Sequence, residues 1–173
     1  VGSATVSITD STVNILPNAD GEALLAISAS AFNFGAIEQG GDAVGGEVDV
    51  AITNSTITGG TLSVAAVGQG GSVDDPSMGQ GGDATGGTIN LTITNSTLML
   101  ETAPDTIGFV FNPDTGQQEE QTFPGAINQL SASATGGSGA IGGDATGGSV
   151  TVDSDQSTLM GASSATNGGE FSV

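Results

Sequence analysis

The 173-residue chain contains no lysine, arginine, histidine, cysteine, tryptophan or tyrosine, whereas it holds 19 acidic residues and has a formal net charge of −19. Without cations it cannot neutralise phosphates or anionic lipid headgroups, which removes the main source of affinity for nucleic acids and anionic membranes. Without histidine, cysteine and lysine, most nucleophile–base pairs and most transition-metal sites cannot be built. We therefore expect no nucleic-acid partner, no catalytic or cofactor-binding residues, and no enzyme.

Other absences limit what can be inferred about the cell biology of the chain. No apolar run reaches 18 residues, so we expect no membrane span. Lack of cysteine leaves the redox compartment open. No starting methionine or signal peptide is present, and Val1 is interpreted as a processed end or a cut through a longer chain. The lack of lysine and arginine removes every trypsin-type cleavage site, which suits an extracellular location.

Glycine-rich repeats dominate what is present. Similar lines run over 40–58 (GGDAVGGEVDVAITNSTIT), 81–99 (GGDATGGTINLTITNSTLM) and 142–160 (GGDATGGSVTVDSDQSTLM). Aligning the chain on its Ser-Thr steps places Ser11, Ser55, Ser96 and Ser157 in one column, at spacings of 44, 41 and 61 residues. Repetition at 20–50 residues is typical of solenoids and arrays. We assign repeats to 1–39, 40–80, 81–141 and 142–167, and a partial repeat to 168–173 by matching it to 45–50.

Within each repeat the hydrophobic period is two. Val48, Val50 and Ile52 alternate with polar or small residues, and Ile89, Leu91 and Ile93 do the same. This pattern predicts strands with one buried face, and no helical stripe is present. Many short, evenly spaced strands with glycine turns predict an all-β fold, a parallel β-helix (β-solenoid) of Gly-rich repeats. A β-sandwich is disfavoured, because its core would rarely lack tryptophan and tyrosine.

An aspartate stands between the two glycine pairs of each copy, at Asp42, Asp83 and Asp144. We expect these glycines to form the corners of the coils, where φ is positive and backbones approach closely. The aspartates then have two interpretations: turn residues that bond nearby amides, or ligands of calcium, a hard cation that prefers oxygen.

Further acidic residues bear on the calcium hypothesis. Asp153 and Asp155 begin the segment DSDQS (153–157) like a calcium loop, but the glycine and glutamate of an EF-hand are missing. Since 19 carboxylates without a basic partner repel one another, divalent cations are expected to stabilise the fold. The adjacent acids at 74–75 and 119–120 are interpreted as solvated surface.

The third repeat is longer than the second, and the extra residues lie at 102–129. NPDTG (112–116) is a strong turn signal between two strand-length segments, so we predict a projecting β-hairpin arm. The arm carries Phe109, Phe111 and Phe123, three of the six phenylalanines. Two interpretations stay open: the phenylalanines contact a neighbouring molecule, or the arm folds back over the edge of its own solenoid.

Two kinds of motif remain. Asn54, Asn90 and Asn95 begin N-glycosylation sequons, and Asn90 is the best candidate because it lies on the outward phase of its strand. For Asn54 and Asn95 the alternative is a column of stacked polar side chains. GSGAIG (137–142) matches a dinucleotide-binding pattern, but no helix is expected after it, so no nucleotide site is predicted.

The segment SASATGGSGAIGGDATGGSVTV (131–152) resembles the Gly/Ala/Thr-rich repeats of filamentous-haemagglutinin-like β-helix exoproteins and related giant bacterial adhesins. The resemblance is compositional and covers most of the chain. It implies a right-handed parallel β-helix, a location outside the cell and an adhesive or fibre-forming role. The hairpin and the complete lack of lysine and arginine are not features of that family.

The sequence therefore favours an extracellular structural protein that assembles with copies of itself. The chain begins and ends within a repeat, so a head-to-tail junction near Val1, Phe171 and Val173 is expected to complete a unit from two molecules. The alternatives are an adhesin or passenger module that binds through loops and arm, and a calcium-binding matrix or surface-layer component.

Overall fold

The computed structural model describes residues 2–17, 23–35, 38–75, 77, 79–101, 106–112, 117–123, 128–162 and 171–172. In this part of the chain the protein is all-β, without a helix. The first two repeats hold β1 (Ser3–Thr9), β2 (Thr12–Asn14), β3 (Leu24–Ser28), β4 (Ala31–Phe32), β5 (Ala43–Val44), β6 (Glu47–Thr53), β7 (Thr56–Thr58), β8 (Thr61–Ala65) and β9 (Gly68–Gln69). The remainder holds β10 (Ala84–Thr85), β11 (Thr88–Thr94), β12 (Thr97–Glu101), β13 (Thr106–Asn112), β14 (Gln117–Phe123), β15 (Asn128–Ser131), β16 (Ala134–Thr135), β17 (Ala145–Thr146), β18 (Ser149–Asp155), β19 (Thr158–Ala162) and β20 (Phe171–Ser172).

Equivalent strands of successive repeats pair side by side in five parallel sheets. Their orders are β1-β6-β11-β18, β19-β12-β7-β2, β20-β15-β8-β3, β17-β10-β5 and β16-β9-β4. The register places Thr12 beside Thr56, Thr56 beside Thr97 and Thr97 beside Thr158, which confirms the alignment on the Ser-Thr step. We call these five sheets together the stack.

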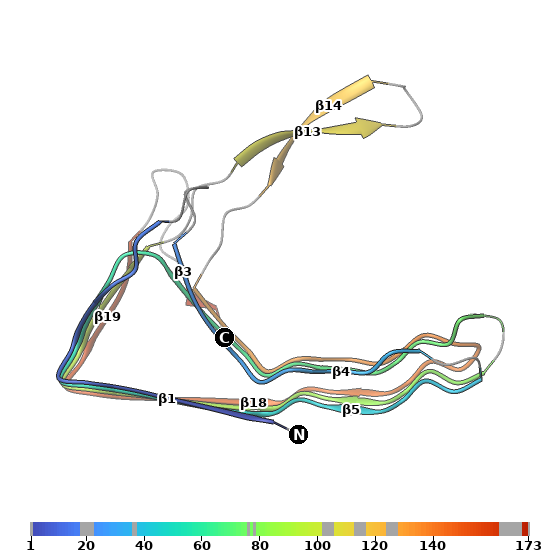
Figure 1. Cartoon of the computed structure of the whole chain (residues 1–173), viewed down its shortest axis with the longest axis horizontal. Helices are drawn as coiled ribbons and strands as arrows, with labels where there is room; N and C mark the ends of the chain where they lie inside the picture. Colours follow the sequence, from blue (N-terminus) through green and yellow to red (C-terminus); the bar gives the residue numbers. More distant parts are fainter. Residues whose placement is uncertain are drawn as a thin grey trace.

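Figure 1 shows the stack end-on, with two parts side by side. The sheets that contain β1, β2 and β3 form the three sides of a triangle. Beyond the triangle the sheets of β4 and β5 run out as two facing layers, which we call the glycine wing (29–35, 38–46, 66–75, 79–87 and 132–148).

The hydrophobic core fills the triangle, and its second and third repeats are the best buried. The inward residues of β6 and β11, which the period of two predicts, are at most 2% exposed: Val48, Val50, Ile52, Ile89, Leu91 and Ile93. Ile57, Leu98 and Leu130 from the other two sides are buried equally well. Burial of each such side chain contributes roughly 1.5–3 kcal/mol.

The glycine pairs do not turn the corner of the triangle, contrary to the sequence-based expectation. The first corner is made by non-glycine residues in the left-handed region: Asp10, Asn54, Asn95 and Gln156 have φ of 48–49°. Short polar side chains tolerate this conformation better than other residues because they bond locally. Among the described glycines, positive φ is confined to Gly59, Gly60 and Gly79.

The paired glycines are instead needed for close approach inside the wing. Backbone N–H groups of Gly71, Gly82, Gly137 and Gly143 donate to the carbonyls of Gly41, Gly71, Gly82 and Gly137, each at 2.9 Å. These bonds zigzag between the two layers along the stack. A Cβ at Gly82 would collide with the Gly41 carbonyl, and one at Gly143 with the Gly82 carbonyl. The layers therefore meet backbone to backbone, where no side chain fits.

The length of the third repeat has two sources rather than the single insertion of 20 residues that the spacings suggested. Leu98 aligns with Ile57 and Gln129 with Ser63, so 31 steps along the chain replace 6. From Ala134 to Ile141, however, 7 steps replace the 12 from Gly68 to Gln80. A gain of 25 in the arm and a loss of 5 at the wing tip give the net difference.

The partial repeat was matched to the wrong place. Phe171 pairs with Asn128 in the β3 sheet, so it occupies the position of Leu62 and not that of Val48. The confusion has a physical origin, because each coil places a Gly-Gly step before two different strands. The segment GGEFSV (168–173) resembles both GGEVDV (45–50) and GGTLSV (59–64).

Candidate functional site

The wing carries a column of aspartates. The carboxylate of Asp42 accepts a hydrogen bond from the backbone N–H of Asp83 at 2.9 Å, and that of Asp83 accepts one from Asp144 at 2.8 Å. Asp42 and Asp83 therefore bond nearby amides, as the first interpretation predicted. Within the described residues no three acidic side chains converge in the way a metal site requires, and calcium binding stays a prediction.

Asp153 and Asp155 lie in a strand and not in a loop. They occupy alternate, outward positions of β18, where both side chains are exposed. Their neighbours one repeat away are Thr92 and Thr94, so hydroxyl groups rather than carboxylates flank them on that side.

The sequon asparagines are partly engaged. Asn54 donates from Nδ2 to the carboxylate of Asp10 at 3.1 Å, which is the stacked polar pair that the sequence suggested. Asn90 donates from Nδ2 to the carboxylate of Asp49 at 2.8 Å. Since Nδ2 is the atom that a glycan would occupy, attachment at either position competes with a hydrogen bond. Asn95 lies exposed in the same corner column as Asn54.

The predicted hairpin is present as an antiparallel pair. The register of β13 and β14 places Phe109 opposite Glu120, Phe111 opposite Gln118 and Phe123 opposite Thr106. Figure 1 shows the hairpin standing clear of the sheets. The three phenylalanine side chains, together with Val1 and Val173, lie outside the part of the protein that the structure describes, and their contacts stay predictions.

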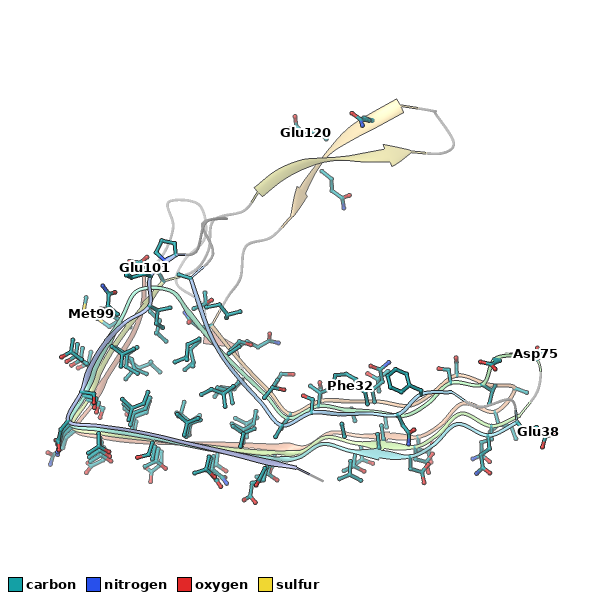
Figure 2. All side chains as sticks on the ribbon, in the orientation of Figure 1. Phe32, Glu38, Asp75, Met99, Glu101 and Glu120 are labelled. Carbon is teal, nitrogen blue, oxygen red and sulfur yellow. The ribbon has the colours of Figure 1, made fainter. Side chains whose placement is uncertain are left out.

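The wing tip is acidic. Figure 2 places Glu38 and Asp75 there, far from Met99 and Glu101 at the corner near the hairpin. Ser77 donates to the Asp75 carboxylate from its hydroxyl at 2.6 Å and from its backbone N–H at 2.9 Å. These two bonds, the hydroxyl first, lower the pKa of Asp75 below its ordinary value.

The glycines of the dinucleotide-like pattern serve the wing. The N–H of Gly137 donates to the carbonyl of Gly82, and the carbonyl of Gly137 accepts from Gly143. Backbone groups committed in this way are not available to cradle a phosphate.

The two ends of the stack are the most extensive unpaired surfaces. β1, β2, β3 and β4 form one end, and β18, β19 and β20 form sheet edges at the other. Interior side chains are uncovered there: Val152 is 40% and Leu159 37% exposed, whereas Leu91 and Leu98 of the preceding repeat are at most 1% exposed. At the opposite end Val6, Ile8 and Val13 are only partly buried. Sequence reasoning placed the junction at three terminal residues, and it missed that whole strands form each end.

No helix in the described part of the chain is long and apolar enough to cross a membrane. Comparisons with protein-family models, with curated proteins and with solved structures find no match to this chain, so no relative supplies a family or a function for it.

Proposed function

We propose that the chain is a β-solenoid and that it serves as a subunit or segment of an extracellular structural protein, assembling head to tail into a surface fibre or filament. One observation carries the proposal. Both ends of the stack present unpaired parallel strand edges and uncovered interior side chains. Open edges of this kind template pairing with another chain.

The geometry of the repeats supports a filament rather than a closed ring. The same sheets continue from repeat to repeat in constant register, so the same step carries one copy onto the next. A contact between two different faces that does not close on itself generates an open filament. The location outside the cell rests on composition, since a chain without lysine or arginine offers no site to trypsin-like proteases.

Negative-stain electron microscopy of the concentrated protein, with calcium and with a chelator, tests the proposal. We expect filaments of uniform width, and fibre diffraction is expected to show a meridional repeat of about 4.8 Å per coil. Dispersed short rods under both conditions would contradict the fibre and would move the function to the loops and the arm.

A second candidate is a binding module, an adhesin or passenger segment. It is favoured by the β13–β14 hairpin, which stands clear of the sheets and carries three phenylalanines. Deleting 102–127 would then abolish surface binding and leave the parallel sheets intact.

A third candidate is a calcium-binding matrix or surface-layer component. It is favoured by the exposed Asp42, Asp83 and Asp144, which stack one strand apart. A rise in melting temperature on titration with calcium, and not with magnesium, would support it.

A further inference from the structure

Two glycines have no neighbour that would require them. Among the glycines in the described ranges, only Gly2 and Gly147 have nothing within 4 Å of the position that a Cβ would take. Neither has a positive φ. They lie at opposite ends of the stack, and the equivalent glycines in the other repeats are all tightly enclosed.

The columns show which way these positions point. A Cβ at Gly87 would collide with the Gly46 carbonyl, and one at Gly148 with the Gly87 carbonyl, so this column points toward the preceding repeat. Gly2 is its first member and points out of the N-terminal end. In the neighbouring column a Cβ at Gly45 would lie 2.5 Å from the nitrogen of Gly87, and one at Gly86 2.5 Å from that of Gly148. Gly147 therefore points out of the C-terminal end.

We propose that the two ends bind each other: the N-terminal end of a second copy stacks on the C-terminal end of the first in the register of the internal repeats, with Gly2 over Gly148. This inference rests on the proposed head-to-tail assembly and specifies its junction. In this register the backbone of the second copy's Gly2 lies against Gly147, in the way that Gly148 lies against Gly86.

The serine ladder continues across this junction. The N–H of Ser11 donates to Oγ of Ser55 at 3.1 Å, Ser55 to Ser96 at 3.0 Å, and Ser96 to Ser157 at 3.1 Å. The ladder thus ends with an N–H at Ser157 and begins with a hydroxyl at Ser11. The Ser11 hydroxyl already donates to the Thr9 carbonyl at 2.7 Å, the same arrangement that orients the Ser55 hydroxyl toward Thr53. It is therefore oriented to accept the Ser157 N–H of another copy.

Charge is compatible with the same register. On the outward face of β18 the acidic residues are Asp153 and Asp155, and the columns place them beside Ser7 and Thr9 of β1 in a second copy. The corner column then brings Asp10 beside the neutral amide of Gln156. In a chain of net charge −19, this register sets no two carboxylates side by side across the β18–β1 contact or its corner. A shift by two residues toward the N-terminus of β18 would place Asp155 beside Asp10's neighbour Ser11 and lose the match of serines.

A large apolar side chain matches the gap that the junction leaves in the wing. Phe34 is 86% exposed and belongs to the column of Gly71 and Gly137. A Cβ at Gly137 would collide with the carbonyl of Gly71, so this column also points toward the preceding repeat. Phe34 therefore points out of the N-terminal end. Gly142 faces the same gap from the C-terminal end, because its counterpart Gly81 abuts Gly137, whereas Gly142 has only the Gly137 carbonyl at 3.9 Å.

Sedimentation velocity across a protein concentration series tests the junction with three variants. Gly147→Val adds a side chain where the molecule itself has open space, so folding is expected to be unchanged and the apparent dissociation constant to rise at least tenfold. Phe34→Gly restores the glycine of its column and is expected to weaken association as well. Thr92→Val, in the middle of the outward face of β11, is the matched control and should associate like wild type. Circular dichroism and the melting temperature confirm that each variant is folded.

The outcomes separate the two proposals. If the wild type assembles and Gly147→Val assembles equally well, head-to-tail assembly stands and the junction proposed here is wrong. If the folded wild type stays monomeric at millimolar concentration, the ends are covered by something other than a second copy, such as further repeats of a longer chain, and both proposals fail.

Discussion

Serine residues satisfy the backbone at the first corner of every coil. Ser96 is 3% exposed, accepts the N–H of Ser55 at 3.0 Å and donates to the Thr94 carbonyl at 2.7 Å. Residues in the left-handed conformation just before each serine redirect the chain, and the N–H that follows points along the stack rather than into a sheet. Without a side-chain acceptor this N–H would be buried and unpaired.

Replacing Ser96 by alanine tests the ladder. Ser96→Ala leaves the Ser55 N–H without its acceptor, and a buried unpaired donor costs about 1–3 kcal/mol of unfolding free energy. Ser7→Ala is the control, because Ser7 is exposed and its hydroxyl meets Thr9 at only 3.4 Å, so a change within about 0.5 kcal/mol is expected. Urea unfolding measures both, and equal stabilities would show that the ladder does not stabilise the fold.

Asp75 provides a pH-dependent test at the wing tip. Both hydrogen bonds from Ser77 stabilise the ionised carboxylate, so the folded pKa lies below the ordinary value. The stabilisation is then present above the ordinary pKa and is lost as the pH falls through the lowered one. NMR titration of the carboxyl carbon should show that Ser77→Ala raises the pKa of Asp75. An unchanged titration curve would contradict the role of the hydroxyl.

The wing is an element without a hydrophobic core. Its layers are joined by bonds such as Gly71 N–H to Gly41 at 2.9 Å, and its outer faces carry exposed residues such as Phe32. Because the bonds form only at glycine, the wing depends on the paired glycines as strongly as the triangle depends on its aliphatic residues.

Gly82→Ala tests this dependence. Its Cβ would overlap the Gly41 carbonyl, which is backbone and cannot rotate away, so we expect a loss of at least about 2 kcal/mol in unfolding free energy. Gly147→Ala changes the same residue type in open space and should stay within about 0.5 kcal/mol of wild type. Hydrogen exchange localises the effect: faster exchange at Gly71 and Gly137 is expected in Gly82→Ala. Equal protection in both variants would show that the layers tolerate a side chain.

The elements differ in how far the sequence predicts them. The period of two in Glu47–Thr53 and Thr88–Thr94 predicts both the strands and their buried faces, because burial on one side of a strand is a local pattern. The NPDTG turn likewise predicts the hairpin. The function of the glycine pairs was not predictable, since the layer that excludes a Cβ at Gly82 comes from the preceding repeat and the same coil's far side.

The ends of the stack were only half predictable, for a related reason. The repeat pattern indicates that a solenoid has open ends, but two similar Gly-Gly steps in each coil made the position of Phe171 ambiguous. Only the pairing of β20 with β15 decides it. Features such as the exposed Phe34 in a glycine column become visible once the columns are known.

At the scale of the whole molecule, charge opposes assembly. Each copy carries a net charge of −19 with no cation to offset it, so copies repel one another at low ionic strength. The stack reduces this cost locally, since the acids of β18 lie beside threonines of β11. The aspartate column of the wing does the opposite and places carboxylates one strand apart.

Salt is therefore expected to control assembly. Raising NaCl from 10 to 150 mM shortens the Debye length from about 30 to about 8 Å, which screens repulsion between copies and should increase the sedimenting fraction at constant protein concentration. Calcium and magnesium chloride at matched ionic strength separate screening from binding. Equal effects of the two cations indicate screening alone, whereas a larger effect of calcium that Asp83→Asn diminishes would place bound calcium on the aspartate column. Asp153→Asn, which removes the same charge from the outward face of β18, is the control for net charge. Assembly that weakens as salt rises would show that attraction between charged or polar groups, and not screened repulsion, governs the contact between copies.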